Sequence, residues 1–259
     1  MKVRIRFTKQ GKVRWTSHRD VARIWERALR RAGVPVAYTE GFSPRPRLSF
    51  GLALPTGYES DAEYLDVDLL DPIGPLVDED RPSEQTGPDR RIGLDELPGR
   101  FSACLPGGFA ATAVVPVEPG AGSLQEIVTS CSWEITLAGL DASRVAGAAD
   151  AALAATTLPL VRTRKGRETL DDLRPGVLAL CVAPPTQEGR PVLLADLATQ
   201  PRALRPSELL AACFADVEEP LDITHRVRRT HQWIDCDGAR REPIPVPATS
   251  RPLPSGVRA

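Results

Sequence analysis

The sequence predicts an α+β fold made of two β-α-β-β-α-β halves, each an antiparallel sheet with helices packed on one face. Three observations predict it. Apolar and charged residues alternate from the start, with Val3, Ile5 and Phe7 between Arg4 and Arg6, as in a half-buried strand. A helix with one apolar stripe follows at 18–32. The same succession of strands and helices then returns in the second half, which predicts two ferredoxin-like units.

In the first half, Ser17 is positioned to cap the helix, and Asp20 stands three residues later as in a capping box. Gly33 ends the helix, and Pro35 prevents its continuation. Alternation at 13–15 suggests a second limb of the first strand or its continuation. The remaining expected elements are short strands at 36–39 and 48–54, an alternating strand at 63–69, a helix at 94–105 and a strand at 111–117.

The second half repeats the plan with weaker contrast. The expected elements are a strand at 132–137, an alanine-rich helix at 142–155, strands at 178–182 and 192–194, a helix at 207–215 capped by Ser207, and a final strand at 223–234. The domain boundaries follow: 1–120 with a flexible insertion at about 71–91, 128–237, and a proline-rich, disordered or extended tail at 238–259.

Composition narrows the possible classes of protein. The chain has 259 residues, 42% of them hydrophobic, and no run long enough to cross a bilayer, so we expect a cytoplasmic protein. Its five cysteines are scattered without a CxxC pair, and its three histidines form no HxH or HExxH pattern. We therefore expect unpaired thiols, no metal site and no cofactor.

The charge is distributed unevenly. Residues 1–50 carry thirteen Lys and Arg against three acidic residues, a balance of +10 within a chain whose net charge is −1. This asymmetry predicts a basic interaction surface. Arginine binds phosphates through two parallel hydrogen bonds and stacks on bases, and nearby rings add stacking surface unless they belong to the core. The candidate RNA- or partner-binding residues are Arg4, Arg6, Arg14, His18, Arg19, Arg23, Tyr38, Phe42, Arg45 and Arg47.

A catalytic motif is harder to find. The chain contains no P-loop, no GxGxxG and no GxSxG. His18 is the single candidate for general-base work, because it lies at a helix start beside Arg14 and Arg19; a structural role at the helix end is the alternative. The acidic residues at 66, 68 and 71 fit the solvent face of a strand better than a metal site.

Residues 14–54 contain the strings Arg-Trp-Thr-Ser-His-Arg-Asp-Val and Gly-Phe-Ser-Pro-Arg-Pro-Arg, and further matching segments follow at 63–67 and 105–108. The chain thereby resembles the radical SAM-associated family DUF2344, and the helix start and Gly-Phe-x-Pro loop show a remote similarity to Cas6-type RNA-processing proteins. The usual family loop reads Asn-Pro-His-Pro where this chain has Arg45 in place of the histidine. That difference argues against an acid–base role for the loop and leaves a phosphate contact intact.

The resemblance implies a partner role. Members occur fused to a radical SAM enzyme or as separate proteins, and their genes lie near those of an E/G-type ribonuclease and ribosomal proteins. This chain lacks the CxxxCxxC motif that holds a radical SAM cluster. We therefore expect a non-catalytic accessory protein of a radical SAM enzyme that binds RNA or a ribosome-linked substrate. The alternatives are a protein-docking module without nucleic acid, and a metal-independent RNA-processing or modifying enzyme that uses His18.

Overall fold

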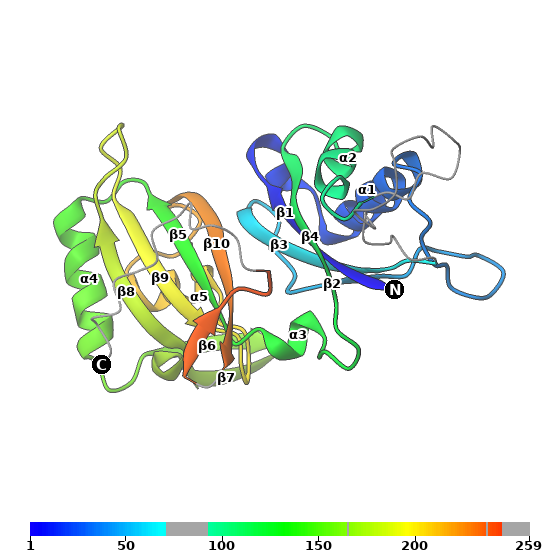
Figure 1. Ribbon diagram of the computed structural model, residues 1–259. Coiled ribbons are helices and arrows are strands. Elements are labelled where there is room, and N and C mark those ends of the chain that lie inside the picture. Colours follow the sequence, from blue (N-terminus) through cyan, green and yellow to red (C-terminus); the bar gives the residue numbers. More distant parts are fainter. Residues whose placement is uncertain (71–92, 165, 237, 245–259) are drawn as a thin grey trace. The chain divides into compact units, whose positions relative to one another are not determined.

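The computed structural model describes residues 1–70, 93–164, 166–236 and 238–244. The chain divides into two compact units, Met1–Ile127 and Val128–Ala259, and each is described by itself (Figure 1). The fold is α+β, as the alternation predicted. The expected insertion at 71–91 and the tail beyond 244 lie outside the described residues.

The first unit contains, in chain order, β1 (Lys2–Lys9), the 3-10 turn η1 (Gly11–Trp15), α1 (His18–Arg31), β2 (Leu48–Phe50), β3 (Glu59–Asp68), α2 (Leu97–Cys104), β4 (Phe109–Pro116) and α3 (Leu124–Ile127). Its strands lie in the order β4-β1-β3-β2, and every neighbouring pair is antiparallel. The edge strand β2 is shorter than the sequence predicted, and 13–15 forms the turn η1 instead of a strand, because Gly11 takes a positive φ of 68°.

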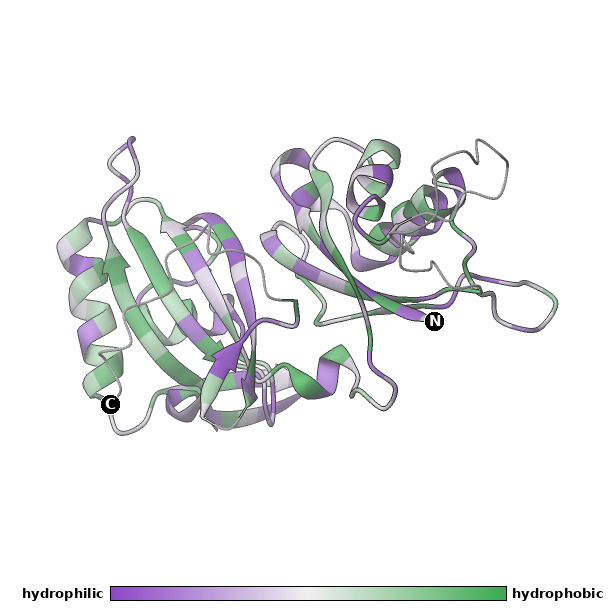
Figure 2. Ribbon diagram, viewed as in Figure 1, coloured by the Kyte–Doolittle hydropathy of each residue, from purple (hydrophilic) through white to green (hydrophobic). Residues whose placement is uncertain are grey.

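The core of this unit lies between the sheet and its two main helices. Val3, Ile5 and Phe7 of β1 face the same cluster as Trp25 of α1 and Phe101 of α2, so both helices cover one face of the sheet (Figure 2). Ser17 caps α1 as predicted, since its Oγ accepts a hydrogen bond from the Asp20 amide at 3.2 Å.

The second unit contains β5 (Ser130–Leu137), α4 (Ala142–Ala154), β6 (Pro159–Arg164), β7 (Arg167–Asp172), the short 3-10 turn η2 (Arg174–Gly176), β8 (Val177–Ala183), β9 (Val192–Ala198), α5 (Pro206–Cys213), β10 (Thr224–Cys236) and β11 (Ala239–Arg241). Its strands lie in the order β10-β5-β9-β8, again antiparallel throughout. Helix α4 packs on β8 and contacts α5.

Three features of the second unit differ from the expectation. Strands β6 and β7 form a separate antiparallel hairpin between α4 and β8. Residues 239–241, expected in the tail, pair with β10 as β11. The N-cap of α5 is Arg205 instead of Ser207, because Pro206, which has no amide hydrogen, occupies the first helical position.

The face of the first sheet opposite its helices contains a buried ion pair. Arg4 on β1 and Asp66 on β3 are directly opposite in the register. Arg4 donates two parallel hydrogen bonds to Asp66, at 2.8 and 3.0 Å, and each side chain is 7% exposed. A buried charge whose partner is removed is costly, so this pair fixes the register of the two central strands.

Replacing Asp66 by alanine should lower the free energy of unfolding by about 3 kcal/mol or more, because the Arg4 guanidinium loses its buried partner. The exposed pair Arg144–Asp216, 2.6 Å apart, provides the control, and Asp216→Ala should cost less than about 1 kcal/mol. Urea denaturation followed by circular dichroism measures both. Equal losses for the two variants would show that the Arg4–Asp66 pair has no special role.

Candidate nucleic-acid interface

A stripe of arginines runs along the outer face of α1. Val21, Trp25 and Leu29 face the core, and at 100° per residue this directs Arg19, Arg23, Arg27 and Arg30 to the opposite side. All four arginines are exposed. Within the described residues, only Arg23 of these four has a carboxylate partner, Asp20 at 3.4 Å. We call these four residues the α1 arginine stripe; it extends the predicted pair Arg19 and Arg23 by two turns.

The start of α1 is held in place by Lys9, a residue that the sequence analysis did not select. Lys9 ends β1, is 2% exposed, and donates hydrogen bonds from Nζ to the carbonyl oxygens of Arg14 at 3.1 Å and Thr16 at 3.0 Å. These bonds hold η1 and the residue before the N-cap. A lysine at the end of an alternating strand gives no sign in the sequence that its ammonium turns inward.

His18 is exposed at the first position of α1. Its ring lies edge-on to Phe50 of β2, with 5.2 Å between ring centres. It lines a small pocket together with the buried side chains of Lys9 and Glu63. In the described part of the chain, the His18 ring makes no hydrogen bond to a carboxylate that would orient it as a general base. The contact with Phe50 places the start of α1 beside the edge strand.

The segment 36–47 folds back on itself beside β2 and β3, and we call it the arm. Its limbs meet through the bridge between Tyr38 and Pro46, and the bridge between Val36 and Leu69 joins it to the sheet. Figure 1 shows it as the blue projection beyond β2. The expected strand at 36–39 is thus reduced to two isolated bridges. The arm carries four predicted binding residues, all exposed: Tyr38, Phe42, Arg45 and Arg47.

Three other predicted residues are engaged within the first unit. Arg4 is the buried partner of Asp66, so we exclude it from any binding surface. Arg6 lies on the same side of β1 and donates to Thr112 Oγ1 at 3.4 Å. Arg14 is 3.7 Å from Glu59 and lies over the ring of Trp15, which is 63% exposed. The prediction from sequence therefore found the basic region. It did not distinguish strand arginines that pair with groups inside the protein from those that face solvent.

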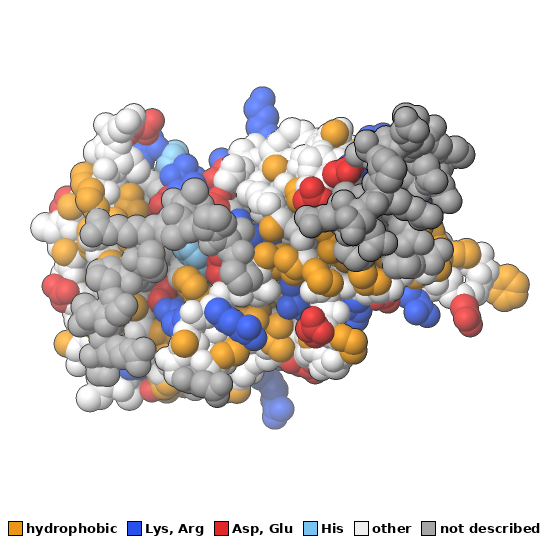
Figure 3. Space-filling view, in the orientation of Figure 1, with side chains coloured by type: hydrophobic (Ala, Val, Ile, Leu, Met, Phe, Trp, Pro, Cys, Tyr) orange, Lys and Arg blue, Asp and Glu red, His pale blue; other side chains and the backbone are white. Residues whose placement is uncertain are grey.

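The arginines of the second unit are mostly neutralised. Seven of them have a carboxylate oxygen within 3.2 Å: Arg144, Arg162, Arg190, Arg202, Arg226, Arg228 and Arg240. Figure 3 shows acidic side chains beside many of the basic ones in this unit. These charges therefore stabilise local geometry more than they attract an anion.

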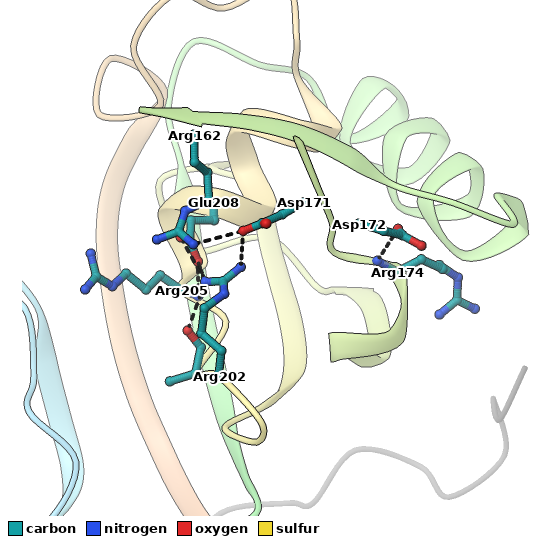
Figure 4. Close-up of polar contacts among 8 residues, drawn as sticks. Arg162, Asp171, Asp172, Arg174, Arg202, Arg205 and Glu208 are labelled. Atoms are coloured by element: carbon teal, nitrogen blue, oxygen red, sulfur yellow. Dashed lines mark hydrogen bonds and ion pairs between the residues drawn. The ribbon is translucent and has the colours of Figure 1, made fainter. Parts of the chain in front are cut away.

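The ion pairs at the β6–β7 hairpin are the clearest example of arginines neutralised within the second unit (Figure 4). Arg162 of β6 contacts Asp171 of β7 at 2.9 Å and Glu208 of α5 at 3.2 Å, and Arg202 contacts the same two carboxylates. The hydrogen bond to Asp171 raises the pKa of Arg162 above its ordinary value. Since a two-stranded hairpin alone is marginally stable, this network anchors it to α5.

Strands β10 and β11 of the second unit carry an aromatic and basic cluster that sequence reasoning missed. Trp233 stacks on His231, with 4.8 Å between ring centres, and Arg240 lies over Trp233 at 4.8 Å. Arg240 also contacts Asp196 at 2.6 Å. The rings and charges of this cluster contact one another, which fits a structural role. The alternation of His, Arg and Trp along 225–233 is the feature of the sequence that could have predicted this cluster.

The cysteines are unpaired, and Cys131 is buried. Burial raises the pKa of the Cys213 thiol to about 11, so it is a neutral thiol near pH 7. Among the residues that the structure describes, no three His, Cys, Asp or Glu side chains gather as metal ligands would. None of the helices described is both long and apolar enough to cross a membrane.

The chain matches a known protein family over most of its length. The model of the family DUF2344, described as an uncharacterized protein conserved in bacteria, matches residues 2–206. The match includes the α1 arginine stripe, the arm and the β6–β7 hairpin, and it ends at the start of α5. No curated protein matched the chain.

Lys9→Met should lower the free energy of unfolding by about 2 kcal/mol or more, because two carbonyl oxygens lose a charged donor in a buried setting. Nearby Lys12 is exposed, and Lys12→Met is the control with the same change in charge. Hydrogen exchange of the amides at 10–18 gives a local measurement beside urea denaturation. Unchanged exchange there in Lys9→Met would mean that Lys9 does not hold the start of α1.

Proposed function

This chain belongs to the DUF2344 family, and from that premise we propose that it is a cytoplasmic, non-catalytic accessory protein of a radical SAM enzyme. In this role it binds RNA or a ribosome-linked substrate through the α1 arginine stripe and the arm. The enzyme supplies the radical chemistry, and this chain supplies the contact with the substrate.

The observation that carries the proposal is the contrast between the two sets of arginines. Seven arginines of the second unit have a carboxylate within 3.2 Å. Five arginines of the α1 arginine stripe and the arm have no carboxylate partner among the described residues. They are Arg19, Arg27 and Arg30 of α1, and Arg45 and Arg47 of the arm. Unneutralised guanidinium groups on the helix and on the projection each attract a polyanion, because each phosphate contact releases condensed counterions.

The fold supports the proposal by analogy. We infer that both units are ferredoxin-like, since each has four strands in the spatial order 4-1-3-2, antiparallel pairing and two helices on one face. The β6–β7 hairpin is an insertion into the second unit. Sheets of this plan are frequent RNA platforms, although fold alone does not decide function.

The partner enzyme is inferred from the family resemblance. The chain carries no CxxxCxxC sequence, so the proposal places the iron–sulfur cluster on a separate protein. The proposal leaves the second unit for docking such a partner, since seven of its arginines already have a carboxylate partner.

The first test measures RNA binding by the full chain. A fluorescent single-stranded RNA is titrated at several salt concentrations, and its anisotropy gives the affinity. We expect affinity to fall steeply with salt. The variant Arg19→Gln, Arg27→Gln, Arg30→Gln should bind more weakly and reduce the slope by up to about 2, since each phosphate contact on a single strand contributes about 0.7.

The matched control removes the same charge from the second unit. Arg167, Arg205 and Arg241 are all exposed, and the triple change of these residues to Gln should leave affinity and slope near those of the unchanged chain. An equal loss in both triple variants would mean that net charge alone drives binding. No binding by the unchanged chain at low salt would overturn the RNA-binding part of the proposal.

The second test identifies the partner. A tagged chain is purified from its native cells at moderate salt, with and without ribonuclease, and the captured proteins and RNA are identified. We expect a radical SAM enzyme together with enriched RNA, and we expect ribosome-linked proteins to be lost after ribonuclease. If the radical SAM enzyme is retained while no RNA is enriched, the basic surface is a protein-docking site instead.

A further inference from the structure

We propose that the arm is a stacking clamp for unpaired RNA bases, with Phe42 and Tyr38 as the stacking platforms and Arg45 and Arg47 as the phosphate contacts. This inference rests on the proposed function and makes it more specific. It states that the substrate is single-stranded where it meets the arm.

The two limbs of the arm are joined to each other and to the sheet by backbone hydrogen bonds. The Thr39 amide donates to the Arg45 carbonyl at 2.8 Å, and the Arg47 amide donates to the Ala37 carbonyl at 2.8 Å, which joins the two limbs. The Ala37 amide donates to the Asp68 carbonyl at 2.7 Å, which ties the arm to β3. Because the limbs are paired, the arm is preorganised, and binding costs less conformational entropy than it would in a flexible loop.

The aromatic residues of the arm are exposed to an extent that packing does not explain. Phe42 at the tip has a relative exposure of 110%, and Tyr38 one of 42%. Figure 3 shows hydrophobic atoms on the same projection. Leaving a phenylalanine in water forgoes the free energy of burying its ring. A base stacked on the ring covers this apolar surface again and adds a stacking contact.

The charge of the arm selects a nucleic acid as the occupant. Arg45 and Arg47 are exposed and, among the described residues, have no carboxylate partner, while Glu40 is the one acidic residue between 36 and 47. A hollow at the base of the arm is lined by Lys2, Thr39, Arg47 and Ser49, and also by Asp66 and Asp68. Asp66 is already neutralised by Arg4. In a nucleic acid, phosphates alternate with flat bases. Arg45 and Arg47 can contact the phosphates while the rings of Tyr38 and Phe42 stack on the bases.

The accessible ring faces also favour a single strand. In a duplex the base faces are covered by their neighbours, and the deep major groove of RNA excludes side chains. Unpaired bases can turn outward onto Phe42 and Tyr38 while their phosphates meet the arginines.

The experiment compares variants of Phe42 in the full chain against a labelled 12-nucleotide single-stranded RNA and the same strand annealed to its complement. We expect tighter binding of the single strand. Phe42→Ala and Phe42→Leu should both weaken it about tenfold or more with an unchanged salt slope, and Phe42→Trp should retain affinity. Leu170→Ala on the β6–β7 hairpin, which removes another exposed apolar side chain, should change nothing.

Three outcomes would overturn the stacking clamp. If the unchanged chain binds the single strand and Phe42→Ala binds equally well, the arm does not stack bases, while the proposed function stands. If Phe42→Leu retains affinity, the contact is apolar packing and not stacking. If polyglutamate displaces the RNA and its own binding depends equally on Phe42, the arm is a dock for an acidic protein. Absence of RNA binding altogether would instead overturn the proposed function.

Discussion

The packing of α1 on β1 is the constraint on which the rest of the first unit depends. Trp25 is fully buried, with its ring 5.0 Å from Phe7 of β1 and 6.0 Å from Phe101 of α2. Such edge-to-face contacts fix the rotation of a helix about its axis. Once Trp25 points inward, the arginines at 19, 23, 27 and 30 must point outward. The basic face is therefore a rigid consequence of the core, and its charges have a defined spacing.

Much of the fold could be predicted because its elements carry clear periods. The helix expected at 18–32 is α1 at His18–Arg31, and its Ser17 cap and Gly33 end follow from local rules that need no tertiary information. The alternating strand expected at 63–69 falls within β3 (Glu59–Asp68) except for its last residue, and β3 begins four residues earlier. Periodicity cannot show pairing, so the strand order in each unit became visible only in the structure.

The site was predicted less well, for a physical reason. A strand alternates between two faces, and sequence alone does not say whether an outward residue meets solvent or a neighbouring strand. Arg4 and Arg45 are equally basic in the sequence, yet one is buried against Asp66 and the other is exposed on the arm. The same ambiguity left Phe42 open between core and surface. Only the backbone pairing at 36–47 shows that the chain turns away from the core there.

The two units show two ways of using arginine, and the difference has an energetic cost. In the second unit, paired guanidinium groups join strands and anchor a hairpin, as Arg162 does between Asp171 and Glu208. On α1, like charges three and four residues apart repel by a few tenths of a kcal/mol per pair, about 0.2–0.5. The helix tolerates this repulsion because its stability comes from the buried stripe around Trp25. A bound polyanion removes the repulsion, so ligand binding and stability of α1 are coupled. Among the described residues, only Arg23 of the four arginines has a carboxylate partner, and the repulsion that a bound polyanion would remove is the physical argument for a ligand on this face.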